Sequence, residues 1–137
     1  MSDLPTRAPR RNVETDPFWD GCTAGRLVLP RCDRCDELIW YPRRFCPFCA
    51  GTDVSWAEVS GRGTVYSYTI IRRGSGAFRH AGPYVLAYVE LDEGPRMLTN
   101  VVGADPESVH VGQPVHVVFD DTGDGEAIPR FAPAPSN

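Results

Sequence analysis

Four of the five cysteines in this sequence form two Cys-x-x-Cys pairs, Cys32 with Cys35 and Cys46 with Cys49. A Cys-x-x-Cys turn directs two thiolates toward one point, and two such turns complete a tetrahedral shell around a divalent metal ion. The segment 36–45 is long enough for a hairpin that brings the two turns together. The spacing therefore predicts one zinc ion in a zinc ribbon, with two disulfides or two unrelated turns as the alternatives.

The metal is expected to be structural. An all-cysteine shell has no open coordination position for catalysis, although a rubredoxin-type iron site would use the same ligands. Four thiolates leave the site negative, and the arginines that flank the pairs soften this charge: Arg31, Arg34, Arg43 and Arg44. The fifth cysteine, Cys22, is expected to be a small buried apolar residue, because the shell is already complete.

The composition favours a compact protein of the cytoplasm. Hydrophobic residues make up 42% of the chain, which suffices for a globular core. No apolar run approaches the ~20 residues that span a bilayer, so no membrane association is expected. Residues 1–13 carry arginines without the apolar stretch of a signal peptide. Cysteines used as metal thiolates agree with a reducing compartment.

The charge argues against nucleic-acid binding. The formal net charge is −4, and four metal-bound thiolates around one divalent ion make it more negative still. Zinc-ribbon proteins that bind nucleic acid need a basic face for the phosphate backbone. Acids and arginines are interspersed here, so no nucleic-acid partner is expected.

The chain begins with a flexible arm and a helix. Residues 1–14 are polar and without periodicity, which predicts a flexible N-terminal arm. Residues 15–53 are expected to hold a short helix and the zinc ribbon. Thr15 offers an N-cap, Pro17 suits the first helical turn, and Gly25 ends the helix.

The rest of the chain is expected to be all-β. Segments rich in Val, Ile, Tyr, Thr or Phe and bounded by turn residues predict strands at 27–29, 38–41, 54–59, 63–71, 84–91, 97–102, 115–120 and 128–131. One helical turn is possible at 105–109. The number of short strands suits a small closed barrel over 54–131, of OB-fold type, with an SH3-like barrel or a sandwich as the alternative. The tail 132–137 is expected to be disordered.

The order of these parts resembles the zinc-ribbon OB-fold family catalogued as domain of unknown function 35. The resemblance covers about residues 15–131 and rests on Phe18-Trp19, Leu27 through Cys35, Tyr41-Pro42-Arg43 before Cys46-Pro47-Phe48-Cys49, Gly61 through Thr69, Pro83 through Gly94, and Val111 through Val115. Members of that family accompany thiolase-like enzymes that act on acyl-CoA. These include archaeal thiolase complexes and the lipid-transfer-protein-like aldolases of steroid side-chain degradation. The resemblance implies a non-catalytic zinc subunit in a hetero-oligomer that stabilises its partner and helps form the acyl-CoA channel. Thiolase, aldolase and synthase partners all stay open.

The titratable residues agree with a non-catalytic role. The chain has three histidines, His80, His110 and His116, and no nucleophile motif accompanies them. His116 alternates with valines on a predicted strand, which is typical of a surface or rim histidine. The sequence does not predict an enzyme acting alone.

The segment 72–84 is the candidate ligand loop. Its glycines free backbone N–H groups to approach an anion, and its arginine side chains match phosphate oxygens. A CoA thioester is therefore a possible ligand of Arg72, Arg73, Phe78, Arg79 and Tyr84. The alternatives are a solvated hairpin loop or a loop that grips an acidic partner. The acidic tract 120–126 lacks the spacing of an EF-hand and is expected to be a polar hairpin tip.

The rival function is a stand-alone nucleic-acid-binding module. OB-fold faces stack bases on aromatic rings, and four tyrosines could supply such a platform: Tyr66, Tyr68, Tyr84 and Tyr88. The acidic charge disfavours it.

Overall fold

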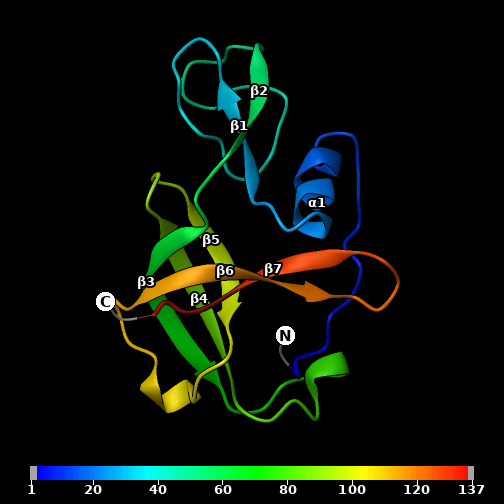
Figure 1. Cartoon of the computed structure of the whole chain (residues 1–137), viewed down its shortest axis with the longest axis vertical. Helices are drawn as coiled ribbons and strands as arrows, with labels where there is room; N and C mark the ends of the chain where they lie inside the picture. Colours follow the sequence, from blue (N-terminus) through cyan, green and yellow to red (C-terminus); the bar gives the residue numbers. More distant parts are fainter. Residues whose placement is uncertain (1–2, 136–137) are drawn as a thin grey trace.

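A computed structural model describes residues 3–135, and it has two parts joined end to end (Figure 1). A small ribbon lies at one end, a β-barrel lies at the other, and helix α1 packs beside the junction. Residues 1–2 and 136–137, at the outer ends of the predicted arm and tail, lie outside the described residues. None of the helices within residues 3–135 has the length and apolar character needed to cross a membrane.

The predicted helix is confirmed as α1 (Asp16–Thr23). Phe18 and Cys22 point into the core from one face of this helix. The helix ends at Thr23, and Gly25 just after it has a φ of 79° and donates its N–H to the carbonyl of Cys22 at 3.0 Å. The Thr15 side chain makes no capping hydrogen bond. Asn12 holds the turn that precedes the helix, because its Oδ1 accepts the N–H of Thr15 at 3.0 Å.

The ribbon contains a two-stranded antiparallel sheet of β1 (Val28–Cys32) and β2 (Val54–Glu58). The segment of β2 was expected at the start of the barrel, but it pairs with β1 from Val28–Glu58 to Cys32–Val54. The two Cys-x-x-Cys turns, which we call the knuckles (residues 32–35 and 46–49), therefore lie between these strands, and the first of them begins at the last residue of β1.

The strand predicted at 38–41 is wrong. This segment forms only an isolated bridge, Arg31 with Leu38, against β1. Ile39 donates its N–H to the carbonyl of Pro30 at 2.8 Å, but proline has no N–H to return the bond. The ladder therefore stops after a single step.

The barrel consists of five strands, which are β3 (Arg62–Ile71), β4 (Tyr84–Leu91), β5 (Arg96–Val101), β6 (Pro114–Asp121) and β7 (Ala127–Pro133). They close in the order β3-β4-β5-β7-β6, with a parallel contact between β5 and β7 at Val101–Phe131 and antiparallel pairing elsewhere. This closed Greek-key order confirms the OB-fold. Two one-turn 3₁₀ helices interrupt the connections, η1 (Gly76–Phe78) and η2 (Pro106–Ser108).

The barrel core follows the alternation of the strands. In β4 the residues Val85, Ala87, Val89 and Leu91 are buried, whereas Tyr88 between them is exposed. Phe18 and Cys22 of α1, Leu27 before β1 and Leu29 of β1 join the same core cluster. The ribbon has a second, smaller cluster around Cys32, Ile39 and Cys46. The metal-binding tip of the ribbon thus has a core of its own, whereas the base of the ribbon shares the barrel core.

The described part of the N-terminal arm contacts the barrel. Arg130 donates to the carbonyl of Pro5 at 2.7 Å and to the hydroxyl of Thr6 at 2.8 Å. Arg11 pairs with Asp16 in α1 at 3.0 Å and with Glu126 after β6 at 2.9 Å. These contacts tie residues of the arm predicted to be flexible to both α1 and the β6–β7 hairpin.

Candidate metal centre and ligand loop

The structure brings the four paired cysteines together. The sulfur atoms of Cys32, Cys35, Cys46 and Cys49 all lie within 4.8 Å of one another. Cys32 Sγ lies 3.6 Å from Cys49 Sγ, and Cys35 Sγ lies 3.5 Å from Cys46 Sγ. A tetrahedral zinc ion with Zn–S bonds of about 2.3 Å needs sulfur atoms about 3.8 Å apart, whereas a disulfide needs about 2.0 Å. The four thiols therefore fit a metal and not two disulfides.

Matching local structure builds the two knuckles. Asp36 donates its N–H to the carbonyl of Cys32, and Ala50 donates to the carbonyl of Cys46, each at 2.8 Å. Asp36 and Ala50 both have positive φ, 65° and 62°. These turns fold each chain segment back over its own sulfur atoms, which is why short Cys-x-x-Cys spacing suffices.

Backbone N–H groups donate to sulfur atoms of this centre. Phe48 donates to Cys46 Sγ and Gly51 donates to Cys49 Sγ, each at 3.4 Å. The backbone N–H of Cys35 lowers the pKa of the Cys32 thiol to about 7, which favours the charged sulfur that a metal requires. Against the backbone N–H groups of Glu37 and Gly51, burial and the neighbouring thiols raise the pKa of Cys35 to about 12 and also raise that of Cys49. With all four positions filled by cysteine, zinc here would hold the ribbon together and have no position open for substrate.

Cys22 is remote from this role. It is fully buried in α1 and belongs to the barrel core cluster. Burial raises the pKa of its thiol to about 12. As the sequence predicted, it behaves as a small apolar residue.

The candidate ligand loop lies at the opposite end of the barrel from the ribbon (Figure 1). It connects β3 to β4 and contains η1. The rings of Phe78 and Tyr84 contact each other in a tilted arrangement with centroids 5.0 Å apart, while Arg73 and Arg79 are exposed. Arg72 forms an ion pair with Glu107 of η2, a contact that sequence reasoning missed because 35 residues separate the two. A hollow of about 350 Å³ beside the loop is lined in part by Tyr84 and Val85.

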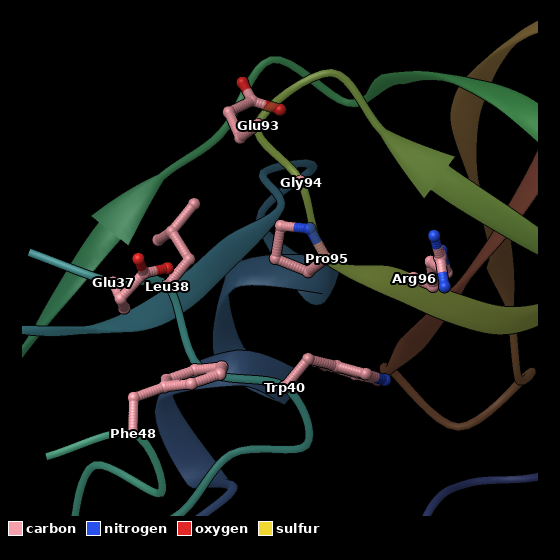
Figure 2. A pocket seen from close by; sticks show the side chains of 8 residues that line it. All are labelled: Glu37, Leu38, Trp40, Phe48, Glu93, Gly94, Pro95 and Arg96. Carbon is pink, nitrogen blue, oxygen red and sulfur yellow. The ribbon is translucent and has the colours of Figure 1, made fainter.

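A cleft between ribbon and barrel was also missed. It has a volume of about 280 Å³ and lies between Leu38, Trp40 and Phe48 of the ribbon and residues 93–96 at the β4–β5 turn (Figure 2). We call it the ribbon–barrel cleft. The one feature of the sequence that indicated this cleft was Phe48, an aromatic residue inside a metal knuckle, where a side chain is expected to be exposed.

The histidines occupy separate segments. His80 lies in the candidate ligand loop, His110 follows η2 and His116 lies in β6. Within residues 3–135, the four knuckle cysteines are the one group of three or more His, Cys, Asp or Glu side chains close enough to share a metal ion.

A closed four-cysteine ribbon joined to a five-stranded OB barrel defines the class of zinc-ribbon OB-fold proteins. Residues 19–55 match the family model described as "ChsH2, rubredoxin-like zinc ribbon domain", and residues 56–120 match "ChsH2, C-terminal OB-fold domain". The chain belongs to this ChsH2 family of zinc-ribbon OB-fold proteins, and several of its relatives carry the name DUF35.

Relatives of different length share this unit. A "DUF35 domain-containing scaffold protein" of Methanocaldococcus jannaschii is 35% identical over 94 residues, which are 68% of this chain and 67% of that protein. A "Probable enoyl-CoA hydratase alpha subunit" of Thermomonospora curvata is 37% identical over 129 residues, 92% of this chain. The chain spans 40% of the length of that second relative.

A solved structure shares the whole arrangement. The chain in the "Ltp2-ChsH2(DUF35) aldolase" is 33% identical and superposes with a TM-score of 0.83. The match covers 92% of this chain and 98% of that chain.

Proposed function

We propose that this chain is the zinc-binding, non-catalytic subunit of a thiolase-like enzyme that acts on acyl-CoA. The observation that carries the proposal is the match, over nearly the full length of both chains, to a ChsH2 protein whose aldolase is named with a second component, Ltp2. The scaffold name of the archaeal relative supports a structural contribution. A relative named as a hydratase alpha subunit is much longer than this chain, so its activity need not belong to the shared unit.

The site chemistry supports a structural role for the metal. Cys32, Cys35, Cys46 and Cys49 would hold one zinc ion, which joins the ends of the long connection between β1 and β2. A ribbon with a core of few residues depends on such a cross-link, because it cannot bury enough apolar surface alone. The zinc would keep the ribbon in shape for a partner.

The candidate ligand loop would help form the acyl-CoA channel. Arg73 and Arg79 are exposed and could meet phosphate, while the contacting rings of Phe78 and Tyr84 offer an apolar surface to an acyl or pantetheine chain. Arg72 is partly neutralised by Glu107, so it contributes less charge than its neighbour Arg73. The catalytic groups would belong to the partner.

Co-expression with a thiolase-like candidate partner from the same genome tests the proposal. We expect the two proteins to elute together in size-exclusion chromatography and acyl-CoA turnover to require the complex. Separate elution at micromolar concentration would contradict the proposed partnership.

The second candidate is a stand-alone single-strand-binding module. Tyr66 and Tyr88 are exposed on the outer face of the barrel, where they could stack on bases. The formal net charge of −4 opposes this, because such proteins follow the backbone with a basic groove. Fluorescence anisotropy with labelled single-stranded DNA and RNA at low salt distinguishes the two, and we expect no binding.

A further inference from the structure

The ribbon–barrel cleft presents apolar side chains to solvent. Figure 2 shows Trp40 and Phe48 on one side of the cleft and Pro95 on the other, with Leu38 beside them. The Phe48 side chain is 67% exposed, although a phenyl ring gains free energy from burial. A concave surface that leaves aromatic rings uncovered is typical of an interaction site.

The cleft continues onto the outer face of the barrel sheet. Arg96, which lines the cleft, places its guanidinium carbon 3.9 Å from the ring centroid of Tyr66. Tyr88 and Leu98 lie opposite each other on β4 and β5, and both are about half exposed. A stable interface buries about 800 Å² on each partner, which is more than a cleft of this size supplies. The adjoining sheet face provides the additional apolar area.

The charges around the cleft are predominantly negative. Glu37 and Glu93 both line it. The one cation of the cleft lining, Arg96, is paired with Glu90 at 2.9 Å. Glu93 keeps one oxygen occupied by the N–H of Ser60 at 2.8 Å, and this bond fixes its position at the rim. A partner that docks here would therefore place a basic side chain near these carboxylates.

We propose that the ribbon–barrel cleft, together with Tyr66, Tyr88 and Leu98 of the adjoining sheet face, is the surface on which the catalytic subunit docks. The docking segment of that subunit presents an apolar side chain to Trp40 and Phe48 and a Lys or Arg side chain to Glu37 and Glu93. This inference rests on the proposed function. A second copy of this chain fits less well, because it carries the same negative net charge.

Two matched pairs of variants test the surface, with the thiolase-like candidate partner from the same genome as the binding probe. Phe48→Ala should raise the dissociation constant at least tenfold. Truncation of an aromatic side chain that becomes buried in the complex is among the costliest interface changes. Phe45→Ala is its control, since Phe45 is also an exposed ring of the ribbon but does not line the cleft. We expect Phe45→Ala to change the dissociation constant by no more than about twofold, as is typical of residues outside a binding hot spot.

Charge reversal gives the second pair. Glu37→Lys should weaken binding at least tenfold at low salt and less at high salt, because the repulsion it introduces is screened. Asp124→Lys changes the net charge equally at the exposed β6–β7 hairpin, outside the cleft, and should leave binding unchanged. Tyr88→Ala tests the sheet face independently of the ribbon. Zinc content and melting temperature, measured for every variant, separate a lost contact from a lost fold.

The possible results test the docking surface separately from the proposed function. If the wild-type chain binds its partner and Phe48→Ala, Glu37→Lys and Tyr88→Ala bind equally well, the docking surface is wrong while the proposed function stands. If the wild-type chain does not bind at all, both are overturned. If the free chain forms a dimer in analytical ultracentrifugation that Phe48→Ala disrupts, the occupant is a second copy, and the proposal is overturned in that form.

Discussion

Arg130 donates a hydrogen bond from Nη1 to Asp120 Oδ2 at 2.6 Å, and both side chains are less than 5% exposed. Arg130 and Phe131 are neighbours on β7, so their side chains point to opposite faces, and Phe131 occupies the core. The N-terminal arm meets Arg130 on the other face through Pro5 and Thr6. One guanidinium thus joins β6, β7 and the arm.

Loss of this arginine should destabilise the barrel strongly. Arg130→Ala leaves the Asp120 carboxylate buried, and breaking a buried ion pair costs about 3–5 kcal/mol. Urea unfolding followed by circular dichroism measures the change. Arg62→Ala is the control, because its pair with Asp92 at 3.6 Å is exposed and should contribute little. Equal stability of the two variants would contradict this account of Arg130.

Removal of zinc should unfold the ribbon and spare the barrel. The ribbon cluster around Cys32, Ile39 and Cys46 is separate from the barrel core, and metal binding is coupled to folding in such small sites. We expect elemental analysis to find one zinc per chain and Cys46→Ser to lose it. In ¹H–¹⁵N spectra with a chelator, the signals of residues 32–53 should collapse while those of β3 to β7 persist. An iron–thiolate absorption spectrum, or an unfolded barrel, would contradict this prediction.

Cys22 should be unreactive in the folded protein. The thiolate is the nucleophile, and burial raises the pKa of Cys22 from 9.0 to about 12. Iodoacetamide at pH 8 should therefore label Cys22 only after denaturation, as mass spectrometry can show. Labelling of Cys22 in the native protein at the rate of a free peptide would contradict its burial.

The same shift predicts a pH dependence of stability. The raised pKa means that the folded state holds the Cys22 proton more tightly than the unfolded state. This contribution is complete below pH 9 and is lost as the pH rises to about 12, by at most about 1.4 kcal/mol per pH unit. Urea unfolding at pH 8 and pH 10.5 should show a larger loss for the wild-type chain than for Cys22→Ala. Parallel losses in the two proteins would mean that other groups carry the dependence.

The candidate ligand loop should affect the Michaelis constant rather than turnover. Arg72→Ala combined with Arg73→Ala should raise the constant for acyl-CoA in the complex by about 10- to 100-fold, because a lost charge-assisted hydrogen bond costs about 1.5–3 kcal/mol. Turnover should stay within a few fold of the wild-type value, since the lost contacts would bind the ground state and the transition state equally. Arg62→Ala, outside the loop, should change neither constant. A collapse of turnover in an intact complex would reveal a catalytic role in this chain, and no change at all would place the CoA site in the partner.

Local patterns predicted most of the elements. Apolar alternation between turn residues indicated the five barrel strands, and the Pro17 and Gly25 signals bounded α1 correctly. The strand predicted at 38–41 failed because the β propensity of its residues says nothing about the partner strand, where Pro30 stops the ladder. Propensity describes a segment, whereas pairing depends on its neighbour.

The acidic tract shows that local sequence patterns also fail to predict which side chains are buried. The sequence indicated a polar hairpin tip from Asp120 to Glu126, yet Asp120 is buried against Arg130. Nothing in the spacing of these two residues distinguishes a buried pair from an exposed one. The N-terminal arm, more than a hundred residues away in sequence, covers them.

The sequence alone determined the zinc ribbon and the class of the barrel, because knuckle spacing and strand alternation act over a few residues. Only the tertiary structure decided that β2 completes the ribbon, that Arg130 joins the arm to the barrel, and that Phe48 faces the β4–β5 turn across a cleft. Each of these contacts joins segments distant in sequence. Their geometry follows from the path of the whole chain, which no local pattern encodes.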